Sequence, residues 1–263
     1  MIDRRRFSTL FALITAGLFF LVGKGQAQDA AFAWSKATQD AAFAQANNQY
    51  KNGEYQDAVA TYRSILDGGW ESAALDFNLG NSYFRLHRLG HALVNYERAR
   101  RMRPRDADIE TNLNLARSQL AYTRPAGQGF LRRIIQTFFS WVSLDEATIA
   151  LLALYLGLMA LLGVIAVRPG AEVRLRVPLR VTACFFILGL SLLCVKIKGL
   201  GREALVVRPR AEARFAPFDT ATAHFELSEG MTVFVVAEKP GWLEIERPDG
   251  KAGWIPQDAA VVI

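Results

Sequence analysis

Cysteine is nearly absent from this chain of 263 residues, where only Cys184 and Cys194 occur, both inside an apolar run. Ten residues along a helix place two side chains on different faces, so this pair cannot form an intrahelical disulfide. The scarcity excludes the disulfide framework of many small exported proteins, and a cysteine metal site would lack its other ligands. Ordinary core packing must therefore stabilise the soluble parts, with both cysteines predicted to be small apolar packing residues.

Histidine and the common catalytic motifs are also scarce. The three histidines are His87, His91 and His224, and the first two, four residues apart, belong to no HExxH motif. The sequence contains no glycine-rich phosphate loop, and its serines lack the surroundings of a nucleophile elbow. We therefore expect a protein that is not an enzyme and that requires no metal and no cofactor.

The positive net charge of +6 comes largely from arginines beside apolar runs. Such residues flank membrane segments, so nucleic acid is not expected as a partner. The apolar residues are gathered in three blocks separated by ordinary polar sequence, which argues against one large soluble core. The chain is therefore predicted to be multidomain.

The first apolar block is an export signal in residues 1–27. Arg4 to Arg6 precede an apolar stretch from Leu10 to Val22, and small residues end the block at Ala27. The signal is either cleaved after Ala27 or kept as an anchor, and the arginines suit either the general or the twin-arginine export route. In each case the residues that follow are exported.

The second and third blocks predict transmembrane helices at residues 147–167 and 179–197. The first carries no charge and is long enough to cross the bilayer, and the second reaches that length when its flanking cations extend toward the headgroups. Between them, residues 168–178 form an arginine-rich loop that is predicted to be cytoplasmic. The segments on both sides of the apolar hairpin are therefore expected on the same, exported side of a membrane.

Residues 37–121 contain an internal repeat. A shift of 34 residues aligns Ala46 with Gly80, Ala58 with Ala92, and Tyr62 with Tyr96. This period, with small residues where helices cross and an aromatic residue filling the next gap, is typical of tetratricopeptide repeats. A third segment from Asp106 to Tyr122 continues the phase and is expected to be a capping helix.

In that architecture the first helix of each repeat lines a concave groove. Six residues are the candidate groove residues: Asn47, Tyr50, Lys51, Asn81, Phe84 and Arg85. The asparagines and the basic residues one turn later can bind a peptide backbone or a terminal carboxylate. The alternative is that they are scaffold residues, and Leu115 stands where a third asparagine would be.

Residues 129–143 follow the repeats and combine apolar residues near helical spacing with two arginines on another face. This pattern predicts either a helix lying in the membrane interface or a plain juxtamembrane linker.

Residues 203–263 change to short β-prone runs with an Asp249-Gly250 hairpin turn, which predicts a small all-β barrel. The order of "LSEGMTVFVV", "GWLEIERPDGKAGWIP" and a last strand resembles the bacterial SH3 domain. Trp242 alternates with Leu243 and Ile245 and is predicted to face outward, and with Phe218 it is the candidate binding surface. Trp254 is expected to be packed, with a cost of about 3 kcal/mol or more when it is removed.

The order of modules, from a signal through "NLGNSYFRLHRLGHALVNYERARRMRPRD" and an apolar hairpin to the barrel, resembles the Bat aerotolerance family. The resemblance implies a protein of the bacterial inner membrane, with both soluble domains on the periplasmic side and with von Willebrand A-domain Bat proteins and a MoxR-type ATPase as partners. It does not imply a known catalytic activity. The predicted fold combines all-α tetratricopeptide helical repeats, two transmembrane helices and a small C-terminal all-β SH3-like barrel. The predicted function is a membrane-anchored scaffold for other proteins, and the alternative is a membrane protein that binds peptidoglycan.

Overall fold

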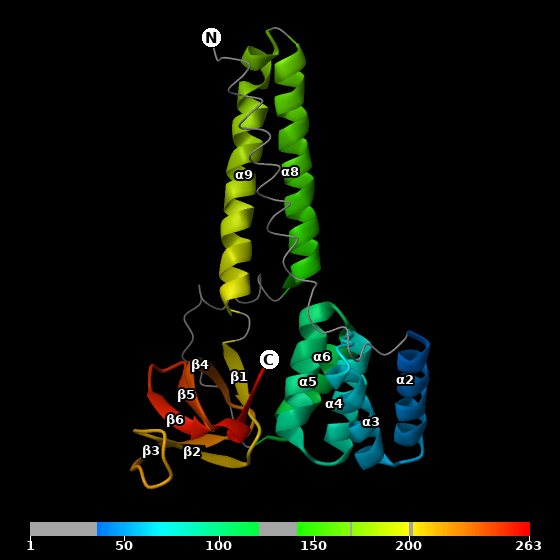
Figure 1. The fold of residues 1–263 in the computed structure, drawn as a ribbon, viewed down its shortest axis with the longest axis vertical. Helices are drawn as coiled ribbons and strands as arrows, with labels where there is room; N and C mark the ends of the chain where they lie inside the picture. Colours follow the sequence, from blue (N-terminus) through cyan, green and yellow to red (C-terminus); the bar gives the residue numbers. More distant parts are fainter. Residues whose placement is uncertain (1–35, 121–140, 169, 200–201) are drawn as a thin grey trace.

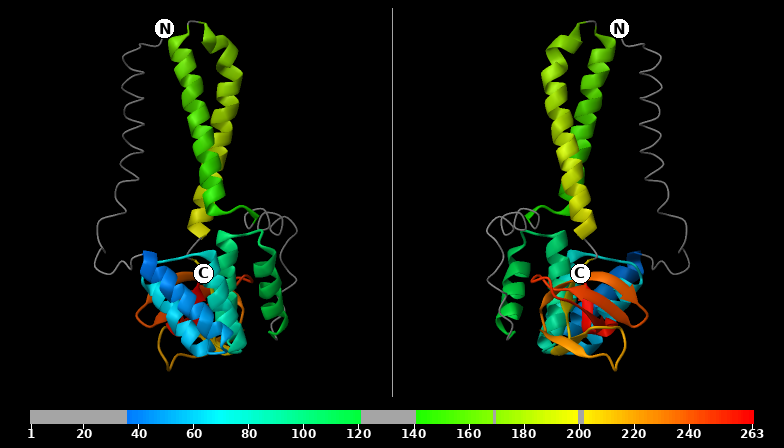
Figure 2. Two further views of the ribbon diagram at one scale, coloured as in Figure 1. Left: turned by 90° about the vertical axis from the view of Figure 1, so that its right-hand side faces the viewer. Right: turned by 90° about the vertical axis from the view of Figure 1, so that its left-hand side faces the viewer.

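The computed structural model describes residues 36–120, 141–168, 170–199 and 202–263. A long helical hairpin stands at one end of the molecule, and a helical layer and a β-barrel lie together at the other end (Figures 1 and 2). The predicted signal at 1–27 lies outside the described residues, as does most of the predicted interfacial helix at 129–143.

The helical layer consists of two antiparallel pairs and one further helix. The pairs are α2 (Lys36–Lys51) with α3 (Tyr55–Asp67) and α4 (Ala73–Arg85) with α5 (Leu89–Met102). The further helix is α6 (Ala107–Ser118), which begins at the N-cap Asp106. Within the first pair Ala46 and Ala58 are fully buried, which lets the helices approach closely. The repeated pairs agree with the predicted period, and their assignment to tetratricopeptide repeats stays a prediction.

The hairpin consists of α8 (Leu144–Val167) and α9 (Ala171–Gly199), both long and apolar enough to cross a membrane. Ser143 begins α8 with a capping box: its hydroxyl accepts from the Glu146 amide at 3.1 Å, and its own amide donates to the Glu146 carboxylate at 3.0 Å. This confirms two adjacent apolar helices, as the sequence predicts.

The loop expected at residues 168–178 is much shorter in the structure, because α9 already begins at Ala171. Arginine, leucine and valine can all continue a helix, and Pro178 is accommodated inside it. The arginine-rich segment is therefore mainly the first two turns of α9. The sharp reversal uses Gly170, whose φ of 81° favours glycine.

The C-terminal domain is an antiparallel sheet in the strand order β3-β2-β6-β5-β4-β1-β7. Its elements are β1 (Glu203–Val206), β2 (Arg210–Arg214), β3 (Ala223–Ser228), β4 (Thr232–Lys239), β5 (Trp242–Glu246), β6 (Ala252–Pro256), η1 (Gln257–Ala259) and β7 (Ala260–Val262). Gly250, at φ 85°, lies in the predicted turn between β5 and β6. Leu227, Val233, Ile245 and Ile255 are fully buried in its core.

The barrel and the helical layer share apolar packing. Leu205 and Val207 of the barrel belong to the same buried cluster as Leu93 and Leu113 of the helical layer. Val261 and Ile263 pack against this cluster from the end of the barrel. The two soluble parts, which flank the hairpin in sequence, are therefore in direct contact at one end of it.

Candidate functional site

Two matching triads of polar side chains form the centre of the helical layer's candidate groove. The Asn47 side-chain oxygen accepts from the Tyr62 hydroxyl at 2.6 Å and from the Asn78 amide nitrogen at 2.9 Å. In the next pair the Asn81 oxygen accepts from Tyr96 at 2.8 Å and from Asn112 at 2.9 Å. Both asparagine oxygens are thus occupied, which fixes the orientation of each amide and leaves its NH₂ group outside the triad.

These triads link successive helices. In the first, α2, α3 and α4 contribute one residue each, and in the second, α4, α5 and α6 do so. Burial raises the pKa of Tyr62 to about 12 and also raises the pKa of Tyr96, so both hydroxyls remain protonated donors at neutral pH. The arrangement holds Asn47 and Asn81 in the same geometry on neighbouring helix pairs.

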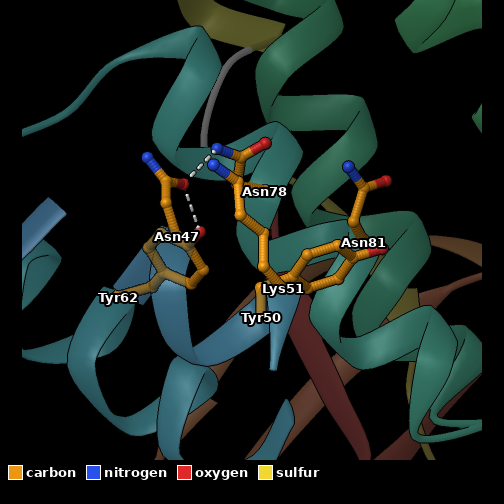
Figure 3. Close-up of a pocket in the computed structure, with 6 residues that line it drawn as sticks. All are labelled: Asn47, Tyr50, Lys51, Tyr62, Asn78 and Asn81. Atoms are coloured by element: carbon orange, nitrogen blue, oxygen red, sulfur yellow. Dashed lines mark hydrogen bonds between the residues drawn. The ribbon is translucent and has the colours of Figure 1, made fainter. Parts of the chain in front are cut away.

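A pocket of about 350 Å³ opens beside the first triad. Its lining consists of Asn47, Tyr50, Lys51, Tyr62, Asn78 and Asn81 (Figure 3). Four of the six predicted groove residues therefore meet in one place: Asn47, Tyr50, Lys51 and Asn81. The Lys51 side chain is exposed and adds a positive charge to this polar, partly aromatic surface.

The other two predicted groove residues have neighbours beyond this pocket lining. The guanidinium carbon of Arg85 lies 4.8 Å from the ring centroid of Tyr55, and the Tyr50 and Tyr55 rings are 5.3 Å apart. Arg85 therefore lies over Tyr55, the ring that packs against Tyr50 of the pocket. Phe84 packs against the helical core as a partly buried residue.

Tyr62, Asn78, Tyr96 and Asn112 are site residues that the sequence interpretation did not assign. The signal was present, because the 34-residue shift relates Tyr62 to Tyr96 and Asn78 to Asn112 as well as Asn47 to Asn81. A repeated polar residue at a buried helix crossing indicates a hydrogen-bonded network rather than an isolated surface contact.

The candidate barrel surface lies on the outer face of β5. Leu243 and Ile245 are buried, whereas Trp242 is partly exposed and shares the outer face with Glu244. Trp242 pairs with Pro256 across the two strands, so both side chains lie on this face. This agrees with the predicted alternation.

Trp254 is buried, with 9% of its surface exposed, so it is packed as predicted, although it lies outside the barrel interior. It pairs with Glu244 and therefore lies on the outer face, while the neighbouring Ile255 side chain is buried in the barrel core. The Lys239 ammonium lies 4.9 Å from its ring centroid, and Arg214 is its other cross-strand neighbour. The Lys239 side chain thus covers part of this ring on the outer face of the sheet.

Phe218 lies in the loop between β2 and β3 and is 53% exposed. Arg214 holds this loop by donating to the main-chain oxygens of Asp219 and Ala221. The adjacent Phe215 stacks on His224 with 4.1 Å between ring centroids. The loop therefore presents exposed aromatic side chains beside the sheet.

The metal-ligating side chains do not gather in the part of the chain that the structure describes. Across residues 36–120, 141–168, 170–199 and 202–263 there is no group of three or more His, Cys, Asp and Glu placed to hold a metal ion.

Comparison with known protein families gives one match. Residues 207–259 match the bacterial SH3 domain, which covers β2 to η1 of the barrel. No curated protein matches the chain. The match agrees with the antiparallel all-β domain.

Proposed function

We propose that this protein is a membrane-anchored scaffold that binds other proteins through the groove of its helical layer. The observation that carries the proposal is the pair of Asn-Tyr-Asn triads, which orient two asparagine amides identically on successive helix pairs. On this proposal the pairs are tetratricopeptide repeats, and no catalytic activity is assigned.

The groove chemistry suits an extended peptide. Each triad uses the asparagine oxygen, so the NH₂ groups of Asn47 and Asn81 can donate to carbonyl oxygens of a bound chain. Lys51 adds an exposed cation for a carboxylate of the same peptide. Tyr50 supplies an aromatic wall in the pocket. A peptide with an acidic side chain or terminal carboxylate beside Asn47 is the ligand that this surface favours.

The partners and compartment follow from the sequence resemblance. We propose that the groove faces the periplasm and receives von Willebrand A-domain proteins of the Bat type, in an assembly that includes a MoxR-type ATPase. The shared core of the helical layer and the barrel supports one compartment for both parts. The predicted export signal is the reason to assign that compartment to the periplasm.

Isosteric substitutions give the sharpest test of the groove. Asn47→Asp with Asn81→Asp keeps the oxygen that accepts from each tyrosine, but replaces the NH₂ donors with carboxylate oxygens. We expect at least about tenfold lower recovery of cross-linked partners from intact membranes, the scale of 1.4 kcal/mol of lost binding.

Asn48→Asp is the control for Asn47→Asp, because Asn48 is an exposed neighbour on the same helix and each of these two substitutions adds one negative charge. Its partner recovery should equal that of the wild type. Unchanged recovery in the Asn47/Asn81 double variant, with helical content preserved, would show that the groove does not bind the partner.

A second function is favoured by the bacterial SH3 match and by Trp242, which is partly exposed beside Pro256. In this proposal the barrel binds peptidoglycan through the outer face of β5. The full chain in detergent should then sediment with purified sacculi, and Trp242→Ala should abolish sedimentation. Sedimentation of the Asn47/Asn81 double variant tests whether the two surfaces act separately.

A further inference from the structure

The loop between α5 and α6 reaches the base of the apolar hairpin. The guanidinium of Arg105 forms an ion pair with the carboxylate of Glu146 in the first turn of α8. Its Cζ atom also lies 5.5 Å from the ring centroid of Trp141. The loop is therefore attached to the start of α8 by a charge contact and a cation–π contact.

The end of α9 closes the same junction. Lys196 donates a hydrogen bond to the main-chain oxygen of Val142, directly before the capping box of α8. The start of α8 and the end of α9 are thus held together next to the helical layer (Figures 1 and 2).

The position of the lipid boundary follows from the hairpin sequence. The apolar part of α8 starts at Ala147, directly after Asp145 and Glu146, and the apolar part of α9 ends near Lys196. In a spanning hairpin, charged residues at helix ends lie in the headgroup layer, because the hydrocarbon begins beyond them. Since Arg105 contacts Glu146, its loop lies at the same depth.

The side chains at the depth of Arg105 and Glu146 are of the types found where proteins meet the lipid headgroups. Met102 is 38% exposed and Trp141 is 59% exposed, although both are large apolar residues. The Arg103 and Arg105 side chains are 65% and 50% exposed. Tryptophan and arginine are favoured at the membrane interface, where an apolar body meets polar headgroups.

We infer that Met102, Arg103, Arg105 and Trp141 form a surface that binds the phospholipid headgroups around the hairpin. Arg103 is the main phosphate ligand, since its ion pair with Asp106 is long, at 4.0 Å, and most of its side chain is exposed. Asp106, Asp145 and Glu146 offset much of the local positive charge. The contact therefore depends on individual guanidinium–phosphate pairs, and anionic lipids strengthen it only moderately.

This surface has a role that goes beyond the proposed scaffold function. It fixes the helical layer against the bilayer, so the groove is presented at a defined height and tilt rather than on a freely rotating tether. It depends on the hairpin lying in a membrane and is independent of which peptide the groove binds.

The test measures the depth of a spin label on the full chain in lipid nanodiscs. Cys184→Ala and Cys194→Ala provide a background without cysteine, and Met102→Cys carries the nitroxide. The control label is at Arg63→Cys, an exposed site on α3. Collision rates with a water-soluble nickel complex report the exposure of each label. We expect at least about threefold lower nickel accessibility at position 102 than at position 63.

Two further substitutions separate lipid binding from internal attachment. In nanodiscs with one third phosphatidylglycerol, Arg103→Gln should raise nickel accessibility at position 102 about twofold, with a smaller effect in pure phosphatidylcholine. Glu146→Gln removes the carboxylate partner of Arg105, while a glutamine can still accept from the Ser143 amide, and it should raise this accessibility less. Equal accessibility at positions 102 and 63 overturns the inference, as does an effect of Glu146→Gln with none of Arg103→Gln. Helical content by circular dichroism confirms that each variant is folded.

Discussion

Helices α3 and α5 are the second helices of the two helix pairs, and 34 residues separate their equivalent positions. Both bury the same stripe, with Ala58 and Tyr62 in α3 matched by Ala92 and Tyr96 in α5. They differ on the opposite side. Where α3 exposes Gln56, Ala60 and Arg63, α5 buries Gly90, Val94 and Glu97. Helix α3 is therefore a surface helix, whereas its equivalent α5 is buried on nearly every side.

The barrel accounts for much of the difference, because it contacts both ends of α5. The N-cap of α5 is Arg88, whose side chain cannot accept a hydrogen bond, and Glu229 of the barrel instead accepts from the Gly90 amide at 2.6 Å. At the other end Arg98 donates to the Val262 main-chain oxygen at 2.7 Å, and Arg101 pairs with Glu203 at 2.8 Å. The Glu229 carboxylate thus lies at the N-terminal end of α5, which is the positive end of the helix dipole.

The contrast shows that one edge of the barrel packs into the helical core, so the barrel is not a separate module on a linker. The hairpin is inserted in sequence between two segments that share this core. For a hairpin that spans a membrane, this contact places both segments on the same side. Which side this is stays a prediction from the export signal and the arginines near Arg168.

The largest expected effect concerns Asp76 of α4, whose equivalent in α2 is Ala42. Asp76 is 1% exposed, and its Oδ1 atom finds no hydrogen-bond donor among the described residues. The pKa of Asp76 is raised to about 7, mainly by burial. The Arg98 charge lowers this pKa and the Glu71 charge raises it, both by less than burial does. Because the folded-state pKa lies above the unfolded value of 3.8, the neutral carboxyl stabilises the fold at low pH, and this stability is lost as the pH rises through 7.

Asp76→Asn should therefore match the wild type near pH 4 and exceed its unfolding free energy by up to about 4 kcal/mol at pH 8, at about 1.4 kcal/mol per pKa unit. Thermal unfolding of the full chain in nanodiscs across this range measures the difference. Asp57→Asn is the control, because Asp57 is an exposed carboxylate on α3. Parallel pH profiles of unfolding free energy for the Asp76 variant and the wild type would contradict the raised pKa of Asp76.

The next effect compares Glu97 with Arg63, its exposed equivalent in α3. Glu97 accepts from Arg100 at 2.6 Å and also pairs with Arg117 of α6. Burial lowers the pKa of Arg100, but Glu97 raises it, and the net shift is upward. Glu97→Ala should cost about 3 kcal/mol, since it leaves two guanidiniums without their shared carboxylate. Arg63→Ala should change the unfolding free energy by less than about 0.5 kcal/mol, and equal effects would remove the contrast.

Local patterns explain what the sequence could predict. The 34-residue shift located Asn47 and Asn81, and alternation along β5 separated Leu243 from Trp242, because both signals depend on neighbours in sequence. The packing of the barrel against α5 could not be predicted in this way, since Glu229 and Val207 lie more than 100 residues from Gly90 in the sequence. Its one local sign was an unsuitable N-cap at Arg88. The position of Trp254 depended on the pairing of β6 with β5 and β2, which the sequence alone did not specify.

The barrel contains a comparable contrast, between Trp254 and Trp242 on one face of the sheet. Lys239 and Arg214 neighbour Trp254, and such flexible side chains can close over the space that a smaller residue leaves. We therefore expect Trp254→Ala to cost about 2 kcal/mol, less than the removal of an interior aromatic. Trp242→Ala should cost less than about 1 kcal/mol. Denaturant unfolding of the full chain, followed by hydrogen exchange in β5, measures both, and equal costs would contradict the difference in burial.

The smallest expected effect tests the contact between α5 and the barrel most directly. A Cβ atom at Gly90 would lie 2.7 Å from the Val207 Cα atom and 3.0 Å from the Glu229 carboxylate, so the barrel must move to admit a methyl group. Gly90→Ala should destabilise the chain by about 1–2 kcal/mol through this overpacking, although alanine is the better helix former by about 1 kcal/mol. Gln56→Ala at the equivalent exposed position of α3 should be neutral. Hydrogen exchange should also increase in β1 and β7 of the Gly90 variant while α2 and α3 keep their protection. A Gly90→Ala variant more stable than the wild type would mean that helix propensity outweighs the contact, and that α5, like α3, is a surface helix on this side.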